Sequence, residues 1–459
     1  MAPFRTLARA LRLARRQRWD PGRLRQSFRS LGGPAEAGPY RRGTLLFLLN
    51  GLCVSIGDAF VGPYQSLFLL SLGASGQQVG LLVSVSGLAG ALMFLPGARL
   101  TARFASYRSL VVTTSLAARA MMALIVVLPW FIRGPAAIGT VIVLVALRDA
   151  PAQLGVPAWT AFSAAIVPQH LRGRFFSSRT FVMTLATLVV VPLAGWLIGA
   201  IAAPGGYQLS FGLGLAAGLV AILLYSRIPV PAGAMARQAH QLPLRKVLAG
   251  LRRHGAFLRF SLTSMLLNVS VQLVGPFFSV YVVRELGADA GFVGIMTTVQ
   301  TAASLLGTRF YGPLVDRRGL RWAMTRTSPF IALLPALWLL PRQPWMVLPI
   351  NLMGGFAWAG YNLAAFNMLL ASTPDDERPL YSALHNTGAA LTTIVGPLIG
   401  GFLFDHWGFH ASLICSAVGR GAAALLIFLL IGKAGRGLGL RRQLPAPAAR
   451  RSAGLPAPR

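Results

Sequence analysis

The stretch Gly62-Pro63-Tyr64-Gln65-Ser66 has a near copy in the second half of the chain, Gly275-Pro276-Phe277-Phe278-Ser279, and this repeat decides the fold. Each copy ends a long apolar run and is followed, at almost the same distance, by Leu-Gly-Ala and then by Val-Gly. Later matches keep the order, since Pro192-x-x-Gly195 corresponds to Pro397-x-x-Gly400. A tandem repeat of this kind predicts two related halves with a binding site where they face each other.

The apolar runs between these markers are long enough to cross a membrane. Hydrophobic residues make up 55% of the 459 residues and charged residues only 12%, whereas soluble domains carry about 25% charge. A spanning helix needs about 20 mainly apolar residues, and the sequence contains twelve such stretches. Backbone groups in lipid must pair within their own segment. The sequence therefore predicts an all-α membrane protein with twelve transmembrane helices in two pseudo-symmetric six-helix bundles.

The polar segments divide the chain into five parts. We expect a basic N-terminal tail, an N-terminal six-helix bundle, a central loop, a C-terminal six-helix bundle and a disordered basic tail, at 1–42, 43–228, 229–258, 259–432 and 433–459, respectively. Basic residues gather in the tails, the central loop and every second short loop. Because positive loops stay in the cytoplasm, both termini are predicted to be cytoplasmic. Segment 4–19 favours an interfacial helix, with a mitochondrial targeting segment as the alternative.

The net charge of +32 is typical of nucleic-acid binders. Here the basic residues flank apolar runs, which indicates contact with a lipid bilayer and not with nucleic acid. The strong preference for arginine over lysine favours a GC-rich genome, and hence a bacterial plasma (inner) membrane. We expect a monomer, with no cofactor and no metal. The absence of a Walker loop argues against ATP as the energy source, and Asp405-His406-x-x-x-His410 lacks a third close metal ligand besides Asp405.

The segment Gly312–Arg321 reads G-P-L-V-D-R-R-G-L-R and resembles the signature loop G-x-L-x-D-R-x-G-x-R of the major facilitator superfamily. The resemblance covers about 43–432. It implies a secondary transporter whose two bundles rock around a central site. It also implies a cytoplasmic gate made by Gly312, Asp316, Arg317, Arg318, Gly319 and Arg321 and, in a degenerate first copy, by Gly97 and Arg103. In that first copy Thr101 replaces the family's aspartate. A plain positively charged turn is the alternative.

The segment Thr392–Gly401 reads T-T-I-V-G-P-L-I-G-G and is similar to the family's antiporter motif. That motif belongs to the fifth span, whereas this copy lies in the eleventh. The resemblance implies efflux; the alternative is that glycine and proline bend the helices and let backbones pack closely. The residues concerned are Pro192, Gly195, Gly396, Pro397, Gly400 and Gly401.

Charged residues inside a span are costly, and they are therefore candidates for function. Asp58, in the first span, is our candidate for proton coupling, and the spacing of Asn50 and Gln65 predicts one polar stripe with it. By the family resemblance, Arg148 faces Asp58 or the substrate across the central cavity. The alternative is a static buried pair that fixes helix packing.

Other polar residues in the spans are open to two interpretations. Asp149 is expected to pair statically with Arg119, while Arg420 has no evident partner and could snorkel. In the second half, polar and aromatic residues either line the cavity or make interhelical and interfacial contacts. These residues are Asn268, Gln272, Trp358, Tyr361, Asn362 and Asn386.

These patterns predict transport of a small solute by alternating access, coupled to protons, with efflux by antiport favoured. Proton symport or facilitated uptake is the near alternative. Two further alternatives are a polytopic membrane enzyme that uses Asp405 and His406, and a receptor of the same fold that does not transport. We expect the chain not to be an enzyme, with a small-molecule substrate and protons as its partners.

Overall fold

The structure is a computed structural model, and it describes residues 41–104, 106–167, 172–229, 255–373 and 378–432. Nearly all of these residues are helical, and none of them forms a strand. The predictions for the two tails and for most of the central loop fall outside the described residues. The all-α prediction is confirmed.

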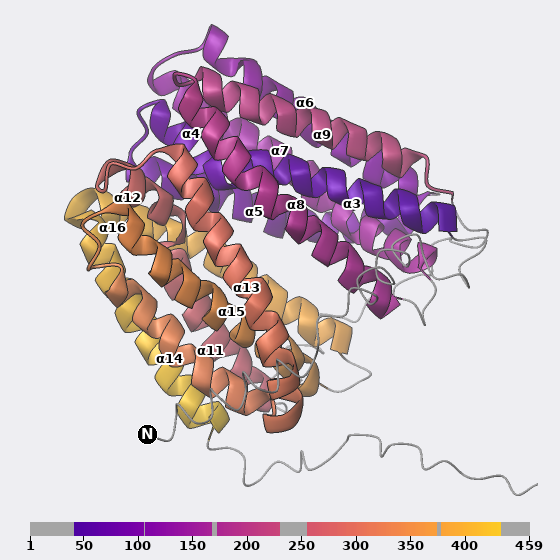
Figure 1. Cartoon of the computed structure of the whole chain (residues 1–459). Helices are drawn as coiled ribbons and strands as arrows, with labels where there is room; N and C mark the ends of the chain where they lie inside the picture. Colours follow the sequence, from indigo (N-terminus) through magenta and orange to yellow (C-terminus); the bar gives the residue numbers. More distant parts are fainter. Residues whose placement is uncertain (1–40, 105, 168–171, 230–254, 374–377, 433–459) are drawn as a thin grey trace, which may run out of the picture.

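Six helices form the N-terminal half (Figure 1), the first of them interrupted by a 3₁₀ turn at Gly62–Tyr64. They are α3 (Arg41–Val61) continued by α4 (Gln65–Ser71), α5 (Gly76–Arg103), α6 (Tyr107–Phe131), α7 (Pro135–Ile166), α8 (Arg172–Ala200) and α9 (Gly205–Ser226).

The C-terminal half repeats this plan, with a 3₁₀ turn at Gly275–Phe277 in its first helix. Its helices are α11 (Gly255–Gln272) continued by α12 (Phe278–Arg284), α13 (Ala290–Arg318), α14 (Leu320–Leu337), α15 (Val347–Ala371) and α16 (Arg378–Leu426), which ends in the π-helical turn Ile427–Gly432. The segment α16 contains two helices, because Gly408 has a positive φ of 76° and turns the chain.

The helices account for the predicted spans. Among the described residues, nine segments are long and apolar enough to cross a membrane, and one of them, Leu384–Ile431, includes the turn at Gly408. When this segment is counted as two helices and α14 and α15 are added, each half has six.

The repeated sequence has a structural reason. The proline of each Gly-Pro pair lacks a backbone N–H, so it ends the first helix and starts a 3₁₀ turn. The Leu-Gly-Ala turns that follow need glycine, since Gly73 and Gly287 have φ values of 92° and 68°. The next helix is then capped by Ser75 in one half and by Asp289 in the other.

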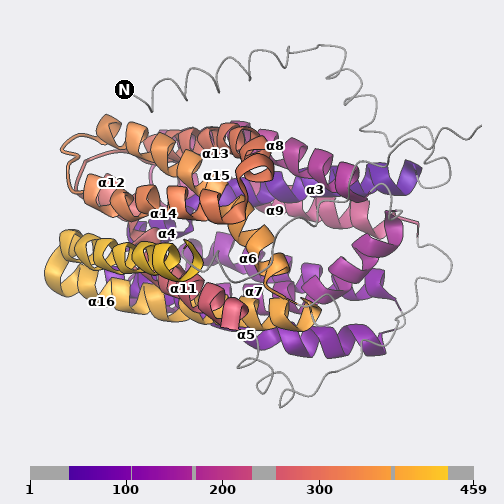
Figure 2. The ribbon, with the colours of Figure 1, turned by 90° about the horizontal axis from the view of Figure 1, so that it is seen from below.

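The two halves touch at the end that holds α4 and α12, and they diverge toward the end where α3 begins and α9 ends (Figures 1 and 2). Contacts between them run along two helix pairs, α5 with α16 and α8 with α13. We call the end that holds α4 and α12 the closed end, and the opposite end the basic end. The basic end carries Arg42, Arg108, Arg227, Arg317 and Arg318, among other arginines.

Glycines, which have no side chain, let the backbones of the two halves meet at the closed end. A Cβ atom on Gly195 of α8 would lie 2.5 Å from the carbonyl oxygen of Ala290 in α13, and one on Gly401 of α16 would lie 2.9 Å from that of Gly76 in α5. Pro192 lies in the same contact, 3.0 Å from where a Cβ on Gly294 would stand. Close packing therefore accounts for these glycines.

Glycines of α16 also pack inside the C-terminal half. A Cβ on Gly396 would collide with Gln272 of α11, and one on Gly400 would collide with the backbone of Leu273. The carbonyl oxygen of Pro397 faces Gly80 of α5. The motif-like segment of the eleventh span is thus a packing surface on both of its sides.

Polar bonds also join the halves at the closed end. The Asp405 carboxylate, at the end of the eleventh span, accepts hydrogen bonds from the backbone N–H groups of Gly76 (2.8 Å) and Gln77 (2.7 Å) at the start of α5. Arg284 donates to the carbonyl oxygen of Ala74 over 2.9 Å. A carboxylate at a helix N-terminus is stabilised by the helix dipole as well as by these bonds. Asp405 therefore links the two halves.

We predict that Asp405→Ala weakens the closed end, because it removes two charge-assisted hydrogen bonds between the halves. Asp405 is exposed, so we expect a loss of about 1 kcal/mol, which is about a fivefold change in the population of the closed end. Spin labels at positions 133 and 342, in a background without Cys53 and Cys415, report the distance across this end.

Asp289→Ala is the matched control, since Asp289 caps only its own helix, through a 2.8 Å bond from the backbone N–H of Phe292. We expect the long-distance population to rise in Asp405→Ala and to stay unchanged in Asp289→Ala. Equal distance distributions in the two variants would contradict the role of Asp405.

Candidate functional site

A cavity of about 450 Å³ lies between the two halves, bounded by α3, α8 and α13. Its wall is unusually rich in hydroxyl groups. Thr180, Thr184 and Thr187 follow one face of α8, and Thr297 and Thr301 follow one face of α13. Because both halves contribute to it, we call it the central cavity.

Asp58 of α3 is exposed and lines the central cavity. Arg119 and, more weakly, Arg148 attract its carboxylate electrostatically. Neither arginine is within 4 Å of it, since the ion pair found in the described part of the chain joins Arg148 to Asp149. Asp58 is thus a cavity-lining acid with nearby cations and no direct ion pair.

Arg148 and Asp149 of α7 belong to a hydrogen-bonded network. Arg148 Nε donates to Asp149 Oδ1 over 2.8 Å, and its Nη2 donates to Gln65 Oε1 over 3.2 Å. Ser86 of α5 donates to the other carboxylate oxygen of Asp149. The network ties α4, α5 and α7 together and satisfies both charges.

The predicted pair of Arg119 with Asp149 is wrong. Arg119 points from α6 toward α9, where its guanidinium packs on the bare backbone of Gly218, and a Cβ there would lie 2.5 Å from its Cζ atom. Asp149 points instead toward α5. The two side chains leave neighbouring helices in different directions, which spacing along the sequence does not reveal.

The predicted polar stripe on the first span is also wrong. Asn50 is buried and donates from Nδ2 to the carbonyl oxygen of Ala221 in α9, at 2.9 Å. Gln65 lies beyond the 3₁₀ turn at Gly62–Tyr64, so its position relative to Asp58 is not that of a continuous helix. Only Asp58 of the three lines the central cavity.

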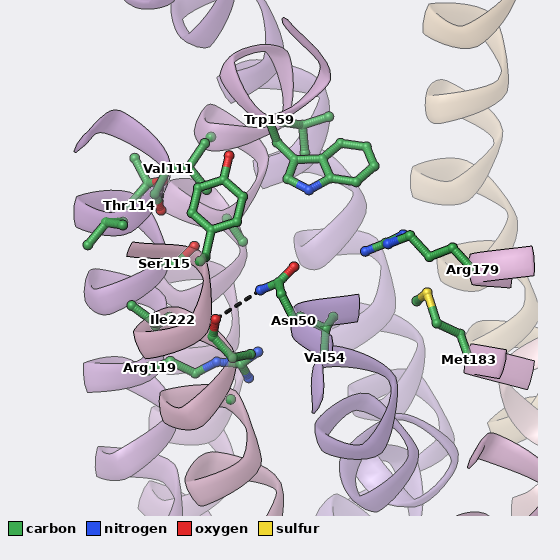
Figure 3. Close-up of a pocket in the computed structure, with 17 residues that line it drawn as sticks. Asn50, Val54, Val111, Thr114, Ser115, Arg119, Trp159, Arg179, Met183 and Ile222 are labelled. Carbon is green, nitrogen blue, oxygen red and sulfur yellow. Dashed lines mark hydrogen bonds between the residues drawn. The ribbon is translucent and has the colours of Figure 1, made fainter. Parts of the chain in front are cut away.

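A second cavity, of about 350 Å³, lies within the N-terminal half among α3, α6, α7, α8 and α9 (Figure 3). We call it the N-half cavity. Asn50, Arg119, Trp159 and Arg179 line it, and Arg179 also lines the central cavity. Among the described residues, no acidic side chain lines it.

A third cavity, of about 340 Å³, is lined by residues of the C-terminal half and by Pro63 of the N-terminal half. Trp358, which we predicted to line the central cavity, lines this cavity instead, together with Gln300 and Asn351. Arg420 also lines it and is 2% exposed, so the prediction that it snorkels is wrong. The Nη1 atom of Arg420 is 3.5 Å from the carbonyl oxygen of Ile331, and its Nε atom has no hydrogen-bond partner in the described structure.

Several predicted residues of the second half lie outside these three cavities. Tyr361 is buried and packs edge-on against Trp358, with 5.7 Å between ring centroids. The others are Asn268, Gln272, Asn362 and Asn386. Sequence reasoning missed the threonine rows of α8 and α13, although their i, i+4 spacing was readable.

The gate segment lies at the basic end, where the halves diverge. Asp316, Arg317 and Arg318 are exposed at the end of α13, and Gly319, with a φ of 85°, separates α13 from α14. The guanidinium of Arg318 lies 4.8 Å from the ring centroid of Trp322. Asp316 makes no ion pair within 4 Å in the described residues. A gating role for this segment stays a prediction.

The first copy of the gate segment is packed inside its own half. A Cβ on Gly97 would collide with the backbone of Leu154 in α7, and Thr101 donates to the Gly97 carbonyl oxygen over 2.7 Å. The side chain of Arg103 lies outside the described residues. On the second copy, Gly312 has open space around its Cβ position.

Parts of this chain are similar to proteins named for multidrug resistance. It is 27% identical over 162 residues to "Multidrug resistance protein MdtG" of Klebsiella pneumoniae (strain 342), which is 33% of this chain and 38% of that protein. It is 28% identical over 166 residues to "Multi-drug resistance efflux pump PmrA homolog" of Lactococcus lactis subsp. lactis (strain IL1403), 35% of this chain and 40% of that protein. The matches thus span about two-fifths of these relatives.

Solved structures show the fold. A bacterial homologue of the iron transporter ferroportin, in an inward-facing state, aligns with a TM-score of 0.68 and 15% identity over 84% of this chain and 98% of that chain. A D-xylose–proton symporter aligns with a TM-score of 0.62 and 15% identity over 85% and 96%.

The sequence repeat, the two six-helix halves and these structures agree with the family comparison. The family model described as Major Facilitator Superfamily matches residues 47–271 and again 260–456. The chain therefore belongs to the Major Facilitator Superfamily of membrane transporters.

Proposed function

We propose that this protein exports a small organic solute in exchange for protons, with Asp58 as the proton-carrying group. The observation that carries the proposal is the position of Asp58, which lines the cavity shared by both halves. A carboxylate inside a membrane is costly, and this one is neither paired directly nor buried away from the cavity.

Protonation of Asp58 changes the charge of the cavity. The ionised carboxylate attracts Arg119 and Arg148, and this attraction disappears when the carboxyl group is neutral. Such a change at the interface of the halves can alter the balance between two rigid-body arrangements. The proton gradient then supplies the free energy for transport.

The direction rests on two supports. The relatives named above are called multidrug resistance proteins and an efflux pump. The halves diverge at the basic end (Figure 1), which the positive-inside rule assigns to the cytoplasm. A solute from the cytoplasm then enters the central cavity in this conformation.

Proton symport is a second candidate, and one observation favours it. Arg119, Arg179 and Arg420 line the three cavities, whereas Asp58 is the single acid among the described residues that line them. A proton on Asp58 increases this positive charge, so a negatively charged solute would bind together with the proton.

We predict that Asp58→Asn reduces gradient-driven accumulation at least tenfold but preserves exchange of labelled solute, because the variant can still change conformation but cannot carry a proton. Proteoliposomes with an imposed pH gradient are tested with a panel of anionic, neutral and cationic aromatic solutes. Asp289→Asn, a change in a helix cap at the surface, should behave as wild type. Accumulation by Asp58→Asn at the wild-type rate would contradict the proposal.

The direction is tested separately in everted membrane vesicles with an acidic interior. An exporter that exchanges solute for protons should accumulate solute inside these vesicles, because their interior corresponds to the outside of the cell. Accumulation only in right-side-out vesicles with an acidic exterior would establish symport instead. Binding of a solute without transport in either preparation would indicate a receptor.

A further inference from the structure

We infer that the N-half cavity binds an organic anion, whose carboxylate or similar group lies between Arg119 and Arg179 and whose apolar part lies against Trp159. This inference rests on the proposed function only in that the chain transports a small organic solute with proton coupling. It names the chemical class of that solute, and an anion favours the symport candidate over exchange.

Within the described part of the chain, no acid neutralises the charge of Arg179. Its side chain is 8% exposed, and its Nε atom makes only a long contact of 3.5 Å with the carbonyl oxygen of Phe47. Its guanidinium lies over two aromatic rings, at 4.7 Å from the centroid of Phe47 and 5.6 Å from that of Trp159. In the described residues no carboxylate lies within 4 Å of it. A buried cation without a counter-ion is unfavourable, so a bound anion would stabilise it.

Arg119 supplies the second positive charge. Gly218 of α9 has no side chain, and the guanidinium of Arg119 occupies the space beside it. Its electrostatic partner, Asp58, lies on the other side of α3 in the central cavity. The face of Arg119 toward the N-half cavity is therefore available to a ligand.

The rest of the wall suits a flat apolar group. Figure 3 shows Val54, Trp159 and Met183 around the same space as Asn50 and Arg179. Methionine adapts to different ligand shapes. The volume of about 350 Å³ is at the small end of ligand cavities, which range over roughly 300–1,000 Å³. One or two aromatic rings with one anionic group match these features.

The cavity of the other half points to the same class of ligand. Arg420 is 2% exposed, its Nε atom has no hydrogen-bond partner in the described structure, and it lines a cavity with Trp338 and Trp358. This is an independent case of a buried arginine beside aromatic rings without an acid. The positive surplus in both halves attracts anions and repels cations.

The test compares three probes of similar shape: 2-naphthoate, 2-naphthalenemethanol and 2-naphthylmethylammonium. The full chain in phosphatidylcholine nanodiscs is titrated with each probe, and heat of binding and thermal unfolding midpoint are measured. We expect 2-naphthoate to bind at least tenfold more tightly than the neutral probe and to raise the midpoint. The cationic probe should bind most weakly. Equal affinity for the three probes would overturn the inference.

Variants assign the binding to this cavity. Arg179→Gln should weaken 2-naphthoate binding at least tenfold, and Arg179→Lys should weaken it less. Arg133→Gln, a change at an exposed arginine of the α6–α7 turn, is the matched control and should bind as wild type. Ser115→Leu keeps every charge but places a larger side chain in the cavity, so it should also abolish binding. This second variant tests the location even if Arg179→Gln does not fold. Unchanged binding in Ser115→Leu would refute the location.

Two further outcomes separate the possibilities that remain. Displacement of 2-naphthoate by phosphatidylglycerol in the nanodisc would show that a lipid headgroup occupies the site, against a soluble solute. Binding of 2-naphthoate that depends on Arg179, but without transport of any solute in the panel, would refute the proposed function and leave the anion site standing. Proton-coupled transport of a cation, at a rate that Arg179→Gln does not change, would refute the anion site and leave the proposed function standing.

Discussion

The structure depends on contact between two backbones that can approach closely only where side chains are absent. At Gly195 and Gly401 the two halves meet through main-chain atoms, and a single Cβ would separate them. In a membrane there is no hydrophobic effect between helices, so such close packing is a principal source of association. Because these contacts occur near the closed end, the halves are free to diverge at the basic end. The central cavity follows from that arrangement.

The charged residues inside the spans fall into two groups, those that are paired within the protein and those without a direct partner in the described residues. Asp149 is neutralised by Arg148 and held by Ser86, and this network needs neither ligand nor proton to be satisfied. Asp58 and Arg179, in the same half, have no direct ion-pair partner among the residues that the structure describes. An unpaired charge in the membrane costs about 2.5–3.5 kcal/mol, so these two groups are the ones we propose for proton and ligand binding.

The sequence predicted the architecture better than the site. Apolar length and the repeat depend on one-dimensional spacing, and both appear in the structure as two halves of six helices. The directions of side chains do not follow from spacing alone. Arg119 turns toward Gly218 because that helix face is bare, and the 3₁₀ turn at Gly62–Tyr64 changes the phase between Asp58 and Gln65. The role of Asp405 was missed because it depends on the start of α5, a segment more than 300 residues away in the chain.

If Asp58 carries the proton and the N-half cavity holds the solute, as proposed above, then Arg119 connects the two sites, because it interacts electrostatically with Asp58 and lines the N-half cavity. An anion in the N-half cavity competes with Asp58 for the charge of Arg119, so the ionised form of Asp58 loses part of its stabilisation and the proton binds more readily. By linkage, the proton then strengthens anion binding by the same factor. An anionic solute therefore favours movement in the same direction as the proton, whereas a cationic solute would compete with the proton for Asp58 and favour exchange. On these proposals, the choice between symport and antiport depends on which cavity the solute occupies and on its charge, and not on the fold.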